Sequence, residues 1–204
     1  QKMAKSKNNF PDPWILFDKY GVDALRFYLM STPVMKGEDM NFSEEGVAEH
    51  YRFLLIYWNT YKFFVDYANL NSWNPDSTRE DDLSVLDKWI LSKLSLLTLN
   101  LNKGFENFDS VTDTQALKDF IVNDFSTWYI RRSRDRVGLE ADLKDRKICL
   151  AVMYKVLVTA ARLAAPVIPF ITEEIFKNLT GKSSVHLENY PEEDQDIDKK
   201  LIND

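Results

Sequence analysis

The chain has 204 residues, of which 45% are hydrophobic and 13% aromatic, and this composition excludes a disordered tail while allowing one helical domain with its own core. Cys149 is the only cysteine, so no disulfide can form within the chain. The formal net charge is −6, which argues against a general nucleic-acid coat.

The first predicted elements are two short helices. Asp12 can cap a helix and Pro13 suits its first position, so residues 14–20 are predicted to be helical until Gly21. Residues 22–30 form the second helix, which ends before the Ser-Thr-Pro sequence that follows it.

Four longer helices follow, each with apolar residues three or four positions apart. They cover about residues 43–68, 83–105, 114–136 and 145–164. The first is expected to bury the stripe Val47, Tyr51, Leu54, Trp58, Tyr61, Val65 and Ala68, and the third to turn inward Leu117, Phe120, Ile121, Phe125 and Trp128. Because each stripe can be buried only against neighbouring helices, the sequence predicts an antiparallel bundle.

The end of the chain carries weaker patterns. A short amphipathic helix is predicted over 169–179 and a lone strand over 184–188, and the acidic residues 192–204 are expected to form loop and linker. The predicted fold is therefore mainly α: a small connecting module at 10–42, a helix bundle at 43–182, and a strand and linker at 183–204.

The first nine residues form a basic loop that includes Lys2, Lys5 and Lys7. Several mobile ammonium groups can follow negative charge as it moves through a triphosphate. On spacing alone this signal is weak, because a short lysine-rich segment is usually just a solvated chain end.

The order of residues in this loop, and the sequence that follows it, indicate a more specific role. Lys2-Met3-Ala4-Lys5-Ser6 resembles the lysine-methionine-serine-lysine-serine signature of class I aminoacyl-tRNA synthetases, although Ala4 stands where that family has serine. The resemblance implies that Lys2 and Lys5 are catalytic, that Lys5 and Ser6 contact ATP, and that the parent enzyme uses ATP with Mg²⁺. Asn8 replaces a usual glycine, but asparagine tolerates positive φ better than most residues.

Further blocks follow in family order and are most similar to isoleucyl enzymes: 31–47, 57–64, 87–92, 128–134 and 165–175. The resemblance implies that the bundle binds the anticodon arm of tRNA(Ile), in a monomeric cytoplasmic enzyme that joins isoleucine to this tRNA. The catalytic fold and the editing insertion of the family are not in this sequence, so the isolated chain is expected to be catalytically incomplete. A valyl or related enzyme and a non-catalytic helical scaffold remain as alternatives.

Four arginines, Arg131, Arg132, Arg134 and Arg136, close the third long helix. The surrounding residues 113–162 carry 10 basic and 7 acidic groups in an otherwise acidic chain. Arginine forks match phosphate oxygens, so the cluster is predicted to contact tRNA. Structural ion pairing and complementation of the helix dipole explain it equally well.

No metal site or membrane span is predicted. The two histidines, His50 and His186, and the single thiol have no paired-ligand spacing. The most apolar stretch, 152–170, is interrupted by Lys155, Arg162 and two prolines, and the chain start lacks the apolar region of a signal peptide.

Overall fold

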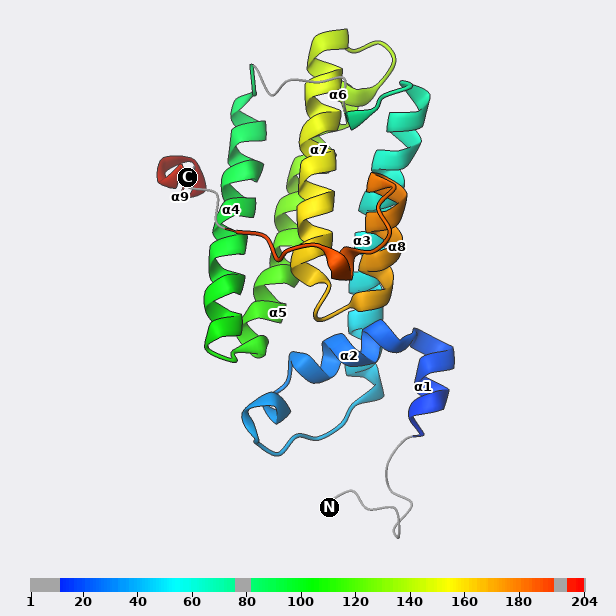
Figure 1. The fold of residues 1–204 in the computed structure, drawn as a ribbon, viewed down its shortest axis with the longest axis vertical. Helices are drawn as coiled ribbons and strands as arrows, with labels where there is room; N and C mark the ends of the chain where they lie inside the picture. The colour runs from blue at the N-terminus through cyan, green and yellow to red at the C-terminus, as the bar shows by residue number, and fades with distance from the viewer. Residues whose placement is uncertain (1–11, 76–81, 193–197, 204) are drawn as a thin grey trace.

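Four antiparallel rods form the body of the molecule (Figure 1). The structure, a computed structural model, describes residues 12–75, 82–192 and 198–203, and these ranges contain helices and no strand. The rods are α3 (Glu44–Leu70), α4 (Val85–Glu106), a composite of α5 (Ser110–Asp119), η4 (Phe120–Ile130) and α6 (Arg131–Val137), and α7 (Leu143–Ala164). The predicted mainly α bundle is confirmed. No helix within the described ranges is both long and apolar enough to cross a membrane.

Side chains at the start of α4 and of α7 cap the first turns of these rods. Ser84 and Asp87 form a reciprocal capping box at α4, and Asp142 accepts a hydrogen bond from the backbone N–H of Asp145 at α7. These contacts satisfy N–H groups that have no partner within the helix, so they fix where each rod begins.

Two short helices and a 3₁₀ turn lie at one end of the bundle, shown in blue in Figure 1. They are α1 (Pro13–Tyr20), α2 (Val22–Met30) and η2 (Pro33–Lys36). Gly21 joins α1 to α2 at a φ of 79°, a conformation that side chains disfavour. Both predicted helices are confirmed, while the domain boundaries at 42/43 and 182/183 stay a prediction.

Two side chains of α2 attach this end to a distant part of the chain. The Asp23 carboxylate accepts hydrogen bonds from the backbone N–H groups of Phe170 at 3.3 Å and Ile171 at 2.7 Å. Arg26 donates from Nε to the carbonyl of Val167 at 3.1 Å and from Nη2 to that of Pro166 at 3.0 Å. Asp23 therefore caps α8 (Pro169–Thr180) from outside that helix, and Arg26 fixes the turn before it.

The end of the chain differs from the prediction. Residues 184–188 were expected to form a strand, but Val185–Leu187 is the 3₁₀ turn η5. The Glu173 carboxylate accepts from the Val185 N–H at 2.8 Å and from the Ser184 hydroxyl at 3.0 Å, and these contacts replace a strand partner. The predicted terminal loop also contains a short helix, α9 (Lys199–Asn203), packed along α4.

The composite rod is π-helical over Phe120–Ile130, and this changes which side chains face the core. The buried stripe runs in steps of four: Leu117, Ile121, Phe125, Tyr129, Ser133 and Val137. In a regular α-helix such a stripe drifts by ~40° per step, whereas the wider π turn makes it drift the opposite way, so the α and π segments together hold the stripe on one side of the rod. Tyr129 therefore points inward and is 0% exposed, and the prediction that Trp128 lies in the core is wrong, since Trp128 is 46% exposed.

The buried face of α3 is also broader than its predicted stripe. Phe53, Tyr57 and Phe64 are buried although the stripe omits them, because α3 packs against α2 on one part of its surface and against η4 and α7 on another. Trp58 was predicted to be buried, but it lies at the rim of this face with 36% exposure, beside Tyr61 at 4.9 Å between ring centroids.

Candidate nucleic-acid interface

Three of the four clustered arginines are exposed on α6. Arg131, Arg132 and Arg134 occupy its first turn, where the rod leaves the π-helical segment. None of the three forms an ion pair with any residue in the described part of the chain. Their charges are therefore free to contact phosphate oxygens.

Aromatic rings lie beside two of these arginines. The guanidinium carbon of Arg132 is 3.3 Å from the centroid of the Trp128 ring, so the group lies directly over the indole. Trp128 in turn lies 6.2 Å from Trp89 of α4. Arg134 is 5.8 Å from the Phe63 ring of α3. The exposed arginines thus lie on a rod flanked by aromatic side chains from both neighbouring helices.

Arg136 differs from the other three because its guanidinium is bound within the protein. Nη1 and Nη2 each donate to one oxygen of Asp87 at 2.8 Å, and Nε donates to Asp145 at 2.9 Å. The Asp87 carboxylate is fully buried, and the Tyr129 hydroxyl donates to it at 2.6 Å. The predicted cluster therefore divides into three exposed arginines and one that joins α4, α6 and α7.

Charge and burial act against each other in this network. Burial raises the pKa of Asp87, but hydrogen bonds from Arg136, Ser84 and Tyr129 outweigh burial and hold the pKa below its usual value. Burial lowers the pKa of Arg136, and the two carboxylates more than reverse this. Burial raises the pKa of the nearby Cys149 thiol to about 11, so this cysteine is an inert core residue.

The predicted phosphate-loop residues Lys2, Lys5 and Ser6 lie outside the described residues. Among the residues that the structure does describe, no group of three or more His, Cys, Asp and Glu side chains could hold a metal ion. His50 is a satisfied polar side chain: Nδ1 lies 2.7 Å from the Gly46 carbonyl and Nε2 3.2 Å from the Ser31 hydroxyl. Burial lowers the pKa of the His50 ring.

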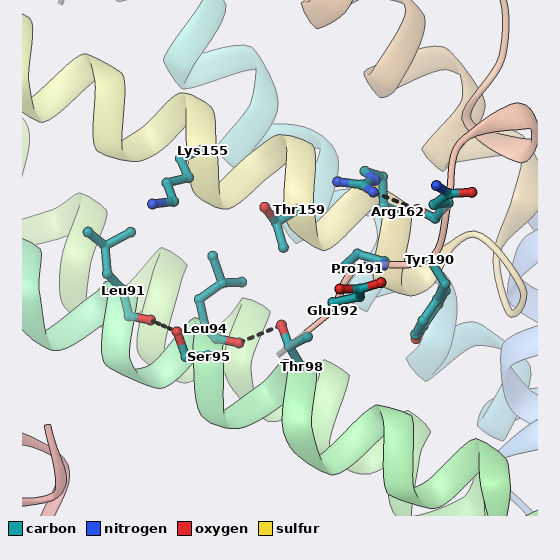
Figure 2. A pocket seen from close by; sticks show the side chains of 11 residues that line it. Leu91, Leu94, Ser95, Thr98, Lys155, Thr159, Arg162, Tyr190, Pro191 and Glu192 are labelled. Carbon is teal, nitrogen blue, oxygen red and sulfur yellow. Dashed lines mark hydrogen bonds between the residues drawn. The ribbon is translucent and has the colours of Figure 1, made fainter. Parts of the chain in front are cut away.

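A cavity of about 360 Å³ between α4 and α7 was not predicted from the sequence (Figure 2). Lys155 and Arg162 of α7 line it opposite Ser95 and Thr98 of α4, and both hydroxyls donate to carbonyls of their own helix. Arg162 donates to the Asn189 carbonyl at 2.5 Å, which holds residues 189–192 against the opening. The sequence feature that could have indicated this cavity is the pair Lys155 and Arg162, which interrupts the most apolar stretch of the chain.

A similar arrangement of helices occurs in a solved synthetase complex. The structure resembles the crystal structure of the ternary complex of Agrobacterium radiobacter K84 agnB2 LeuRS, tRNA and LeuAMS, with a TM-score of 0.69 and 19% identity, over 99% of this chain and 23% of that chain. At this identity the likeness establishes the fold alone. The bundle is thus of the kind found in a class I synthetase.

Comparison with sequence families identifies two families that match parts of this chain. Residues 87–204 match the family described as "Anticodon-binding domain of tRNA ligase", and residues 1–43 match "tRNA synthetases class I (I, L, M and V)". The chain belongs to the family of anticodon-binding domains of tRNA ligases.

Several curated relatives are isoleucine–tRNA ligases. The chain is 41% identical to the isoleucine–tRNA ligase of Dehalococcoides mccartyi strain 195 over 100% of its own length and 21% of that protein. It is 40% identical to the isoleucine–tRNA ligase of Thermus thermophilus, over 99% of this chain and 20% of that protein. It is 38% identical to the isoleucine–tRNA ligase of Chlamydia trachomatis serovar D, over 93% of this chain and 19% of that protein. The chain therefore spans about a fifth of the length of these relatives.

Proposed function

We propose that this chain is the tRNA-binding region of an isoleucine–tRNA ligase that activates isoleucine with ATP and transfers it to tRNA(Ile) in the cytoplasm. The observation that supports this most directly is the 41% identity to such a ligase over the whole chain. The match of residues 87–204 to an anticodon-binding family supports RNA as the partner of the bundle.

The exposed arginines supply the chemistry for this partner. Arg131, Arg132 and Arg134 have no ion-pair partner among the described residues, and they lie together on one turn of α6. Phosphate contacts of this kind position an RNA without reading its sequence. Arg136 has a different role in this proposal: its guanidinium holds the rod in place through Asp87 and Asp145.

In the parent enzyme, Lys2 and Lys5 would stabilise the negative charge that develops as ATP releases pyrophosphate, and Ser6 would contact the same nucleotide. Mg²⁺ would neutralise part of the phosphate charge. This assignment rests on the signature-like sequence of the loop and on the match of residues 1–43 to class I synthetases.

Binding of tRNA(Ile) transcripts across a series of KCl concentrations tests the proposal. We expect affinity to fall with salt, and Arg131→Ala combined with Arg134→Ala to reduce the magnitude of the logarithmic salt slope by about 2, since each phosphate contact contributes about 1. Arg52→Ala is the matched control, because Arg52 is an exposed arginine on α3.

Two results would contradict the proposal. Affinity that does not change with salt would remove the RNA-binding function and favour a helical scaffold. Tighter binding of tRNA(Val) than of tRNA(Ile) would assign the chain to a valyl enzyme instead. If the Arg52→Ala control lowered the slope by about 1, as much as each arginine of the double variant, the effect would reflect net charge and not the interface.

A further inference from the structure

The cavity between α4 and α7 lies where a helix bundle normally packs apolar side chains against each other (Figure 2). The two helices instead face each other with small hydroxyl side chains, Ser95 and Thr98 on α4 and Thr159 on α7. These side chains are too small to fill the space, and a volume of about 360 Å³ stays open. A cavity of this size can hold a small molecule.

The two ends of the cavity differ in character. Lys155 precedes Arg162 by two turns of α7, which is about 10 Å along the helix axis. Figure 2 shows Arg162, Thr98 and Glu192 toward the end where residues 189–192 cross, and Leu91 toward the opposite end. One end therefore offers charged and polar groups, and the other offers apolar surface from α4.

Arg162 has a hydrogen-bond donor that the protein leaves unused. Its Nη2 donates to the Asn189 carbonyl at 2.5 Å. Its Nε is buried and has no hydrogen-bond partner in the part of the chain that the structure describes. Because a buried N–H of a charged group is unfavourable without an acceptor, this guanidinium is suited to an acceptor from a ligand in the cavity.

The wall on α4 offers acceptors. The Ser95 hydroxyl donates to the Leu91 carbonyl at 3.1 Å, and the Thr98 hydroxyl donates to the Leu94 carbonyl at 2.9 Å. Each hydroxyl hydrogen is therefore used within the helix, while the oxygen keeps lone pairs that can accept a hydrogen bond from a ligand.

Residues 189–192, which we call the strap, close one side of the cavity. The Tyr190 hydroxyl donates to a carbonyl of α7 at 3.1 Å, and Asn102 of α4 donates to the Pro191 carbonyl at 3.1 Å, so the strap is attached to both helices. Glu192 adds a carboxylate to the lining. It forms no ion pair with Arg162 or with any other residue in the described ranges.

We propose that this cavity binds a free amino acid with an aliphatic side chain. The carboxylate of the ligand accepts from Nε of Arg162, and its ammonium group donates to the Thr98 hydroxyl and faces Glu192. Its side chain lies against Leu91 and Leu94. The site lies outside the arginine cluster of α6, so the inference does not depend on the proposed RNA-binding function.

The charges of the cavity favour such a zwitterion over a simple ion. Arg162 and Glu192 carry opposite charges at the same end of the cavity. A simple anion meets the Glu192 carboxylate, and a simple amine meets the Arg162 guanidinium, so each has one repulsive contact. A zwitterion can pair with both groups, and the leucines of α4 accommodate its aliphatic part.

Isothermal titration calorimetry of the 204-residue chain with L-leucine tests the proposal. Leucine is the probe because it is not the substrate of the proposed ligase. We expect saturable binding at one site. Two analogues should bind at least tenfold more weakly: 4-methylpentanoate, which lacks the ammonium group, and 3-methylbutylamine, which lacks the carboxylate. Each leaves one charged group of the cavity without its partner.

Two variants place the binding in this cavity. Thr98→Val removes the hydroxyl and keeps the branched shape, and it should weaken leucine binding about fivefold. Thr114→Val is the matched control, because Thr114 is also buried and donates to a carbonyl of its own helix, α5, away from the cavity. It should leave binding unchanged. Arg162→Gln removes the guanidinium and should weaken binding at least tenfold.

Three results would overturn the proposal. Absence of saturable leucine binding by the folded wild type would show that the cavity holds only water. Binding of 4-methylpentanoate as tight as that of leucine, or displacement of leucine by inorganic phosphate, would identify a general anion site. Equal losses for Thr98→Val and Thr114→Val would indicate an effect on the bundle as a whole. Far-ultraviolet circular dichroism establishes that each variant is folded, and the salt series with tRNA tests the proposed function separately.

Discussion

At the residue scale, the guanidinium of Arg136 is the clearest case of a charged group that is paired within the protein. It lies between Asp87, which is fully buried, and Asp145, whose side chain is 42% exposed. Such a buried pair contributes little net stability over an apolar substitute, but removal of one partner leaves the other charge buried and unpaired. The residue therefore matters for the position of α6, on which Arg131, Arg132 and Arg134 lie.

Arg136→Ala is predicted to lower the free energy of unfolding by about 3 kcal/mol, because the Asp87 carboxylate loses its cation in a buried site. Arg136→Lys should show a smaller loss, since an ammonium keeps the charge but cannot fork across both oxygens. Urea unfolding measures both. The exposed Arg52 again provides the control, and Arg52→Ala should change stability by less than about 0.5 kcal/mol. A loss of the same small size for Arg136→Ala would show that the network does not anchor the rod.

At the element scale, the contact between α4 and α5 contains a carboxylate with an unusual environment. Asp113 of α5 is 3% exposed, and its Oδ2 has no hydrogen-bond partner among the described residues. Gly104 of α4 makes room for it, since a Cβ at that position would lie 1.7 Å from Oδ1. Burial, aided by the charge of Asp109, raises the pKa of Asp113 to about 6.

This raised pKa predicts a pH-dependent stability at the α4–α5 contact. The folded state favours protonated Asp113, so its contribution is complete below about pH 4, the usual pKa in an unfolded chain, and is lost as the pH rises to about 6. Asp113→Asn stays neutral, and its advantage over the wild type should therefore grow between pH 4 and 6 and then level off.

Urea unfolding of both proteins across this pH range measures that difference. Asp87, whose pKa is lowered, acts at more acid pH, and His50 contributes equally to both proteins, so neither produces the expected change. A difference between variant and wild type that stays constant from pH 4 to pH 7 is the result that would refute the prediction.

At the scale of the whole molecule, the exposed arginines and the N-terminal helices lie at opposite ends of the bundle (Figure 1). Helix α6 is near one end of the rods, and α1 and α2 pack at the other through the contacts of Asp23 and Arg26. Rods of this length separate the two regions by most of the long axis of the molecule. The arginines that are proposed to contact RNA are therefore held at the end of the bundle away from the N-terminal helices.

The 204-residue chain alone is predicted to give no isoleucine-dependent pyrophosphate exchange. It spans 21% of the Dehalococcoides mccartyi relative, and its match to the family "tRNA synthetases class I (I, L, M and V)" covers residues 1–43. Exchange of labelled pyrophosphate into ATP, with and without isoleucine, measures this directly. Isoleucine-dependent exchange by the purified chain, absent from a Lys5→Ala variant, would contradict the prediction.

The sequence by itself determined the helices and much of their order. The spacing of apolar residues every three or four positions, the capping groups Asp12, Ser84 and Asp142, and the break at Gly21 all act within a few residues, so local chemistry is sufficient to fix them. The resemblance to class I synthetases was equally readable, because ordered blocks of residues carry it.

The tertiary structure decided which side chains reach the surface. A regular 3.6-residue turn would place Trp128 in the core, whereas the rod is π-helical where it packs against α3 and α4, and it buries Tyr129 instead. The division of the arginines depends on Asp87, 49 positions from Arg136 in the chain. The strand expected at 184–188 became a turn because Glu173, on another helix, supplies the hydrogen bonds. Each of these outcomes depends on groups brought together only by folding, which local sequence patterns do not specify.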